Sequence, residues 1–193
     1  MKKIVITGRI ATGKTSILKQ FKYFGCKTFS SDELVKKIYK DDQDIFRVVK
    51  NLVPKAIKDE KIDMKILSNF AFENSFILTE LEKFIHPRLN ILRNQLIKKS
   101  YFFNVKKVVF EIPLLFEKKI NNDFDIIVTT TCNKELQKKR YLLRENSTCE
   151  KFNAINKKFL EDNEKFKKSH FTINTGLGKN HSIKIVKKIM SAI

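Results

Sequence analysis

The 193 residues suffice for one domain with a sizeable core, and a hydrophobic content of 42% excludes a disordered chain. The formal net charge of +19 would suit a nucleic-acid-binding protein, but the basic residues are mostly Lys and are spread along the whole chain. That distribution is typical of solvated surfaces. We therefore expect no specific nucleic-acid partner, although the positive field favours an anionic substrate.

The three cysteines lie far apart, with no CxxC pair and no His cluster, which argues against a zinc site and favours a reducing cytosol. The apolar stretch behind Met1-Lys2-Lys3 ends at Thr7, so it is too short for a signal peptide. No run approaches the roughly 20 apolar residues that span a bilayer. We expect a cytoplasmic protein that keeps its N-terminus, and the sequence leaves its oligomeric state open.

Five short runs rich in β-branched and aromatic residues predict strands, and helical patterns separate them. The runs are Lys3–Thr7, Lys27–Ser30, Lys107–Phe110, Phe124–Thr129 and Phe171–Asn174. Parallel strands need long crossovers, which are usually helices. The alternation therefore predicts a three-layer α/β fold with a central parallel sheet.

Between the second and third strands, over about residues 57–105, the pattern is helical only. We interpret it as a helical insertion within a single domain that covers residues 1–193. Asp63 is a candidate N-cap for a helix over Met64–Phe72. His86-Pro87-Arg88 interrupts the insertion, where it either presents a basic side chain to an anionic substrate or is a helix break with an incidental His. A further helix is predicted over Asn133–Glu145, and another closes the chain.

The segment from Gly8 to Thr15 matches the P-loop pattern of Gly, four residues, Gly, Lys and Ser or Thr. It lies between a predicted strand and a predicted helix, so backbone N–H groups and the positive helix end face one point where phosphates can bind. Lys14 can reach the β- and γ-phosphates, and the Thr15 hydroxyl can bind Mg²⁺. The residues expected to bind the nucleotide here are Gly8, Arg9, Ile10, Ala11, Thr12, Gly13, Lys14, Thr15 and Ser16.

Two carboxylates follow predicted strands, where a phosphoryl acceptor or a metal could be held. Asp32 can take or orient the acceptor's proton, or it can be the N-cap of the helix that begins near Glu33. Glu111 can contact Mg²⁺ through water, or it can be a partly buried loop residue. Residue types alone leave both pairs of alternatives open.

Gln137, Arg140 and Arg144 fall at helical spacings of three and four, so they share one face of the predicted helix. The two arginines can neutralise charge on the transferred phosphoryl group, or they can be solvated surface. Gly176-Leu177-Gly178 lacks the third Gly of a dinucleotide fingerprint, and we interpret it as a loop.

Taken in order, these features resemble the dephospho-coenzyme A kinase family across nearly the full chain. The matching positions are the P-loop at Gly8, Asp32, Leu81-Glu82, His86-Pro87, Ile112-Pro113-Leu114-Leu115-Phe116-Glu117, Gln137, Arg140, Arg144 and Ile173-Asn174. The segment from Pro113 to Glu117 is the most specific of them, because phosphate binding in general does not require it and it is hard to explain in other P-loop kinases.

The resemblance implies a nucleotide-kinase-like core, a helical substrate-binding insertion and a lid over about residues 133–155. The implied reaction moves the γ-phosphoryl group of ATP, with Mg²⁺, to the ribose 3′-hydroxyl of dephospho-coenzyme A, the last step of coenzyme A synthesis. Asp32 would be the base, and Lys14 and Arg140 would complete the catalytic set. Candidates for the two substrates are Arg144 and Asn174 on the ATP side, and His86, Arg88, Leu114, Phe116 and Glu117 on the acceptor side.

The chain departs from the family pattern at several positions. Arg9 and Ala11 stand where the family's loop usually has Gly, so their side chains must point away from the phosphates or the loop must shift. Ser30-Ser31-Asp32 replaces Asp-Ala-Asp, Lys158 replaces Gln, and Ser169-His170 replaces Ala-Asp. The alternatives are another small-molecule P-loop kinase, acting on a nucleoside or nucleotide, and a nucleotide-dependent nucleic-acid-binding protein.

Overall fold

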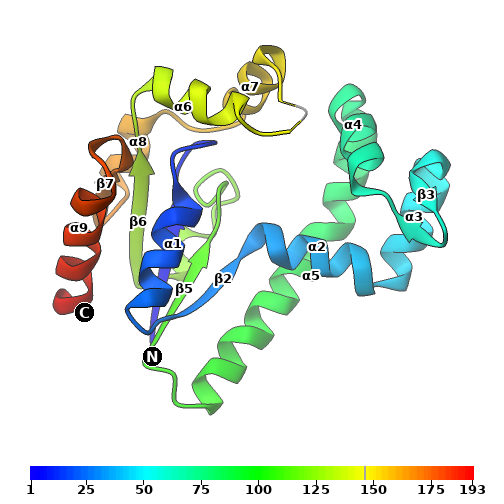
Figure 1. The fold of residues 1–193 in the computed structure, drawn as a ribbon. Coiled ribbons are helices and arrows are strands. Elements are labelled where there is room, and N and C mark those ends of the chain that lie inside the picture. The colour runs from blue at the N-terminus through cyan, green and yellow to red at the C-terminus, as the bar shows by residue number, and fades with distance from the viewer. Residues whose placement is uncertain (146) are drawn as a thin grey trace. The chain divides into compact units, whose positions relative to one another are not determined.

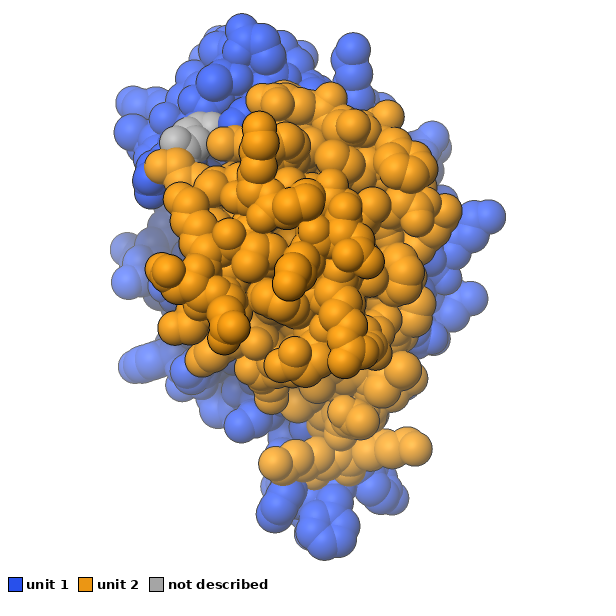
Figure 2. Space-filling view, turned by 90° about the vertical axis from the view of Figure 1, so that its right-hand side faces the viewer, with its two compact units in different colours: residues 1–30, 100–193 blue, residues 31–99 orange. Residues whose placement is uncertain are grey.

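The computed structural model describes residues 1–145 and 147–193. The chain forms two compact units, which Figure 2 shows in different colours. Unit 1 comprises Met1–Ser30 and Ser100–Ile193, and unit 2 comprises Ser31–Lys99. In the part of the chain described, no helix combines the length and apolar character needed to cross a membrane.

Unit 1 is built on a five-stranded sheet in the order β2-β5-β1-β6-β7, and every pairing within it is parallel (Figure 1). The strands are β1 (Lys2–Thr7), β2 (Lys27–Ser30), β5 (Lys107–Glu111), β6 (Ile126–Thr131) and β7 (Phe171–Asn174). The predicted central parallel sheet is therefore confirmed, with each predicted strand found within two residues of its expected start and end.

Two helices, α1 (Lys14–Tyr23) and α9 (Lys179–Ala192), cover one face of this sheet. Both present apolar residues at helical spacing, such as Ile17 and Phe21 on α1 and Val186 and Ile189 on α9, and all four side chains are fully buried. They pack against inward-facing strand residues in one cluster: Ile4, Ile6, Val109, Val128 and Ile173. Burial of such side chains stabilises the fold by roughly 1.5–3 kcal/mol each, which fixes the loop between β1 and α1.

The remaining helices of unit 1 are α6 (Lys134–Leu142), α7 (Cys149–Asn156) and α8 (Asp162–Lys167), with short 3₁₀ turns at Asn121–Asp123 and Thr175–Leu177. The predicted helix over Asn133–Glu145 is too long, because α6 ends at Leu142. The Arg144 N–H bonds to the Tyr141 carbonyl at 3.0 Å, and the Ser147 hydroxyl donates to the Arg144 carbonyl at 2.6 Å. These bonds replace the next helical turn. Arg144 therefore lies beyond the helix that carries Gln137 and Arg140.

Unit 2 contains α2 (Ser31–Asp41), α3 (Gln43–Leu52), a 3₁₀ turn (Pro54–Ala56), α4 (Met64–Glu73) and most of α5 (Ser75–Phe102). Asp63 caps α4 as predicted, accepting from Lys65 N at 3.0 Å and Ile66 N at 3.1 Å. The expectation of helices only is wrong, because a hairpin of β3 (Ile57–Lys58) and β4 (Lys61–Ile62) precedes α4. Two-residue strands carry too few residues to show a period of two.

Pro87 does not break its helix. The interruption predicted at His86-Pro87-Arg88 is wrong, since α5 runs continuously through it. Leu81 and Ile85 are buried in the unit 2 core before the proline, and Leu89 and Leu92 pack against the same core after it. Burial of this stripe offsets the roughly 3 kcal/mol that an interior proline costs a helix.

The hairpin turn contains two residues in the left-handed region, Asp59 with φ 47° and Glu60 with φ 56°. A side chain disfavours this conformation, which Gly adopts freely. Glu60→Gly should therefore raise the free energy of unfolding by about 0.5–1 kcal/mol in urea denaturation. Lys61→Gly, one residue further on within β4, should lower it, and equal effects of the two substitutions would contradict the strain.

Candidate active site

The loop between β1 and α1 folds tightly against the ends of neighbouring elements. Gly8 has φ 143°, and a Cβ there would lie 2.4 Å from the Thr130 carbonyl oxygen. Gly13 has φ 89°, and a Cβ there would lie 3.1 Å from the Thr175 side chain. The Thr12 hydroxyl donates to the Arg9 carbonyl at 2.8 Å. The two motif glycines are thus required by backbone conformation and by close approach together.

Lys14 is the first residue of α1 and is only 8% exposed. Its Nζ donates to the carbonyls of Gly8 at 3.0 Å and Arg9 at 2.8 Å, so the ammonium group lies over the loop itself. Gly13 is the N-cap of α1, and no side chain caps that helix within the described chain. A positive helix end and a cation therefore meet at one loop, which is the arrangement that binds phosphate groups.

Thr15 and Glu111 join the loop to β5. The Thr15 hydroxyl donates to Glu111 Oε1 at 2.9 Å, and Glu111 is 3% exposed at the end of its strand. Hydroxyl and carboxylate oxygens are the ligand types that Mg²⁺ prefers. The donor set therefore fits a magnesium ion. The alternative for Glu111, a partly buried loop residue, is wrong, because Glu111 is the last residue of β5 and is buried.

Arg9 and Ala11, which replace the usual glycines of the loop, point their side chains to its outer side. The loop therefore keeps the backbone path of a P-loop. Arg9 pairs with Glu161 at 3.0 Å and also donates to the Asn156 carbonyl at 3.4 Å. Ala11 adopts φ 57° and packs with Tyr141 and Phe152. The Ile10 carbonyl accepts from Gln137 Nε2 at 2.7 Å. These contacts tie the outer side of the loop to α6, α7 and the start of α8.

Arg140 is held by the segment that follows β7. Its guanidinium donates to the Thr175 hydroxyl at 2.7 Å and to the Thr175 carbonyl at 3.1 Å. Thr175 in turn donates to the Thr12 carbonyl at 2.8 Å, so it connects Arg140 to the loop. Asn174 accepts from the Gly176 N–H at 2.9 Å and starts the short 3₁₀ turn. Arg144 is exposed, with its guanidinium 5.9 Å from the Tyr141 ring centre.

Glu117 is bound to the protein rather than displayed on its surface. Its Oε1 accepts from the Leu160 N–H and from Lys165 Nζ, both at 2.8 Å. The Lys165 side chain is completely buried. Burial lowers the pKa of Lys165, while its contact with Glu117 opposes that change. The two contacts fasten the segment after β5 to α8 and to the residues just before it. The nearby Leu114 is half-buried and Phe116 is buried.

The predicted residues of unit 2 lie on α2 and α5. Asp32 is exposed in the first turn of α2, which begins at Ser31, so the N-cap alternative is wrong. One residue separates it from Ser30, the register partner of Glu111. His86 Nε2 lies 3.3 Å from Glu82 Oε2 on the same helix. Arg88 contacts Asp42 at 2.7 Å and Asp44 at 3.3 Å, so two carboxylates already hold it.

Unit 1 therefore brings together the predicted loop, Lys14, Thr15 and Glu111, and it adds contacts that the sequence did not reveal. Thr130 and Thr175 support the loop, and Lys165 neutralises Glu117. A hydroxyl at the end of a strand gives no distinctive signal. A lysine followed by further lysines, as in Lys165 to Lys168, looks like solvated surface in sequence.

The profile of the dephospho-CoA kinase family matches residues 3–179. The chain is 35% identical to the dephospho-CoA kinase of Bartonella quintana over 176 residues, covering 91% of this chain and 90% of that one. It is 32% identical to the Rickettsia felis enzyme over 193 residues, covering 100% and 98%. The solved dephospho-CoA kinase from Campylobacter jejuni superposes with a TM-score of 0.72 at 26% identity, covering 99% of this chain and 96% of that chain.

The buried Lys165–Glu117 pair predicts an asymmetric mutant series. Glu117→Ala leaves a buried ammonium without its carboxylate and should lower the free energy of unfolding by about 3 kcal/mol. The double variant Glu117→Leu/Lys165→Met removes both charges, so it should be less destabilised than Glu117→Ala alone. Urea denaturation measures all three proteins. A double variant at least as unstable as the single one would contradict a charge pair.

The same pair predicts a dependence of stability on pH. Because the folded pKa of Lys165 lies below its ordinary value of 10.5, the unfolded state binds more protons between the two values. The free energy of unfolding should therefore rise with pH across this interval. Glu117→Gln removes the interaction that opposes the lowered pKa, so the interval below pH 10.5 over which stability rises with pH should be wider in this variant than in the wild type. Parallel pH profiles would contradict the coupling.

Proposed function

The chain belongs to the dephospho-CoA kinase family, and from that premise we propose that it transfers the γ-phosphoryl group of ATP to the ribose 3′-hydroxyl of dephospho-coenzyme A. Membership establishes an ATP-dependent kinase of coenzyme A synthesis. The proposal extends this to the hydroxyl that reacts and to the residues that act. The observation that carries it is the loop in which Lys14 and the start of α1 face one anion-binding point beside Thr15 and Glu111.

Phosphoryl transfer needs little covalent help from the protein, so positioning and charge balance dominate the mechanism. We assign Lys14 to the β- and γ-phosphates of ATP. Its Nζ contacts two loop carbonyls, and a phosphate oxygen is a stronger partner than a carbonyl because the hydrogen bond is then charged on both sides. Ser16 and the loop amides from Gly8 to Thr15 complete the proposed nucleotide site.

We assign the acceptor's proton to Asp32. The residue is exposed at the start of a helix that directly follows a strand of the sheet, and its carboxylate accepts no hydrogen bond from any described residue. A carboxylate with unused acceptor capacity can orient the attacking hydroxyl and take its proton as the new bond to the γ-phosphorus forms and the bond from that phosphorus to the ADP oxygen breaks. The proton thus passes from the ribose oxygen to Asp32.

We propose that Thr15 and Glu111 hold Mg²⁺. When bound, such an ion supplies charge neutralisation between neighbouring phosphate oxygens. The protein's own contribution is to keep the Thr15 hydroxyl and a buried carboxylate side by side, as their 2.9 Å contact does. Burial of Glu111 keeps water from competing for this carboxylate.

Residues 133–155 are the proposed lid, and the helical insertion over about residues 57–105 is proposed to bind the acceptor. Arg140 and Arg144 belong to the lid and are assigned to the negative charge of ATP, and Asn174 to its adenine side. For Arg140 this requires exchange of its bonds with Thr175 for bonds to the nucleotide. His86, Arg88, Leu114, Phe116 and Glu117 remain acceptor-side candidates, although Arg88 and Glu117 each have protein partners.

Replacement of the two central groups should separate catalysis from folding. Lys14→Ala and Asp32→Asn should each lower kcat with dephospho-coenzyme A by about 10²–10⁴-fold, because charge neutralisation or proton transfer is lost. The rate of coenzyme A formation, followed by chromatography, measures this. Asp41→Asn, at the exposed far end of α2, is the matched control and should retain wild-type activity. Full activity of Asp32→Asn would remove the proposed base.

The proposed metal ligands predict a selective change in magnesium requirement. Thr15→Val and Glu111→Gln should each raise the Mg²⁺ concentration that gives half-maximal rate by about tenfold or more, since each removes an oxygen ligand or its charge. Initial rates across a magnesium titration at saturating substrates measure the shift. Thr172→Val, which removes an exposed hydroxyl of β7 outside the loop, serves as control, and unchanged titrations for both Thr15→Val and Glu111→Gln would rule these ligands out.

A further inference from the structure

The end of α5 displays three consecutive aromatic residues. Tyr101, Phe102 and Phe103 are 70%, 79% and 63% exposed, although Ser100 just before them is buried. Because an aromatic side chain can bury about 150–250 Å², the three together expose roughly 300–500 Å², which is the size of the largest apolar patch on a typical monomer. Patches of this size are often functional.

Hydrogen bonds hold the aromatic residues in a defined turn. The Val105 N–H donates to the Ser100 carbonyl and the Asn104 N–H donates to the Tyr101 carbonyl, both at 3.0 Å. Asn104 has φ 52°, so these bonds form the left-handed turn that ends many helices. The two phenylalanine rings of the segment pack edge to face, with centroids 5.3 Å apart. The exposure therefore does not come from a fraying helix end.

This turn leads into the edge of the sheet at which the strands begin, and that edge is basic. Three neighbouring parallel strands each start with a lysine, namely Lys27 in β2, Lys107 in β5 and Lys2 in β1. Lys106 precedes β5, and its carbonyl accepts from the Lys2 N–H at 2.8 Å. The lysines and the aromatic turn all belong to unit 1.

A hollow of about 520 Å³ lies among these lysines. Lys27, Lys106 and Lys107 line it together with Val105, the residue that closes the aromatic turn. Two acids precede β6 at the same edge, and one of them, Asp125, already accepts a backbone N–H at 2.7 Å. Four lysines outweigh these two acids, so the hollow and its rim favour an anionic group such as a phosphate.

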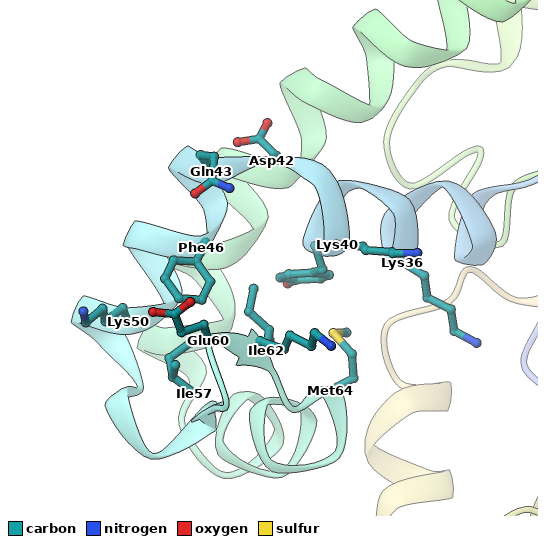
Figure 3. A pocket seen from close by; sticks show the side chains of 12 residues that line it. Lys36, Lys40, Asp42, Gln43, Phe46, Lys50, Ile57, Glu60, Ile62 and Met64 are labelled. Atoms are coloured by element: carbon teal, nitrogen blue, oxygen red, sulfur yellow. The ribbon is translucent and has the colours of Figure 1, made fainter.

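Unit 2 contains a cavity of about 730 Å³ that is built differently. Lysines from α2, α3 and the β3–β4 hairpin line it as well, but Asp42 and Glu60 accompany them (Figure 3). Its apolar residues Phe46 and Ile62 are half-buried inside the lining. A concave lining of this kind admits a small molecule, whereas exposed rings at a helix end can enter a soft surface.

We propose that the aromatic turn and the lysines beside it form a surface that docks on an anionic phospholipid membrane. This docking surface comprises Tyr101–Phe103, Lys2, Lys27 and Lys106. The rings enter the headgroup region and the lysines bind lipid phosphates, and such a pair of signals can hold a protein on a bilayer that it does not span. The loop between β1 and α1 lies at the opposite edge of the sheet, so docking leaves the nucleotide site open to solution (Figure 1).

Two other occupants fit the docking surface less well. Two copies of this chain would bring like-charged lysines together, and a patch of roughly 300–500 Å² is smaller than the about 800 Å² per partner of a standard stable interface. Single-stranded nucleic acid stacks its bases on open ring faces, but the phenylalanine rings meet at 90°, so that one covers the other with its edge. Insertion into lipid requires neither a partner of matching charge nor parallel rings.

A tryptophan reporter tests insertion directly. The chain contains no tryptophan, so Phe102→Trp introduces a single one. With vesicles of equal parts phosphatidylcholine and phosphatidylglycerol, its emission should shift to the blue and be quenched by brominated lipid, because the indole leaves water. Leu177→Trp, at an exposed position after the opposite end of β7, is the matched control and should show neither change. An unshifted, unquenched Phe102→Trp would overturn the proposal.

Co-sedimentation with the same vesicles tests the lysines. Lys27→Ala/Lys106→Ala should lower the partition coefficient at least about tenfold, because each lysine near an anionic membrane adds to the attraction. Lys134→Ala/Lys138→Ala removes the same charge from α6 at the opposite edge and should bind nearly as well as the wild type. All four residues are exposed, so both variants should fold. Equal losses would reveal unspecific attraction of a +19 chain and would overturn the docking surface.

The other occupants give distinct results. Phe102→Ser/Phe103→Ser should bind the vesicles at least about tenfold more weakly than the wild type, and light scattering should give both proteins the same mass in solution. A smaller mass of the variant would assign the surface to a second copy of the chain. A blue shift of Phe102→Trp on addition of a single-stranded oligonucleotide without vesicles would assign it to nucleic acid. Either result would overturn docking on lipid.

Discussion

The structure depends on how closely the loop after β1 approaches its neighbours. Gly8 leaves no room for a side chain beside Thr130, and Gly13 little room beside Thr175, so two residues from the ends of other strands shape the loop. Lys14 then closes the loop from the inside through two carbonyls. Because strand order brings β6 next to β1 and β7 next to β6, this support comes directly from the sheet.

Two loop positions that usually hold glycine in the family hold Arg9 and Ala11 here, and both side chains contact neighbouring elements. Ala11 adopts a left-handed backbone conformation, which is unfavourable for residues with a side chain. Its methyl group is buried with Tyr141 and Phe152. Arg9 reaches Glu161 and Asn156 on the outer side. Residues within the phosphate-binding motif itself therefore couple the loop to α6 and α7, the region assigned to the lid, and to the start of α8. Nucleotide binding and lid position are expected to influence each other through these contacts.

The sequence predicted what depends on local patterns and missed what depends on packing. Continuous apolar runs predicted the strands, and the spacing of Gly, Lys and Thr predicted the loop. Asp63 was recognisable as an N-cap from its residue type and place. The hairpin at Ile57–Ile62 was missed because its strands are too short to show alternation. Pro87 led to a wrong prediction of a helix break, because apolar packing before and after it outweighs the local cost of a proline inside a helix. Lys165 resembles its exposed lysine neighbours until the fold places it against Glu117.

The most direct test of this account is the response of the loop's own amides to ATP. In two-dimensional ¹H–¹⁵N NMR of the full chain, titration with magnesium and a non-hydrolysable ATP analogue should shift the amide signals of residues 8–16 most strongly, with a clear change at Glu111. A comparable titration with inorganic sulfate should shift the same loop signals at higher concentration. Saturation with nucleotide that leaves residues 8–16 unshifted while other amides move would contradict the anion cradle and the mechanism built on it.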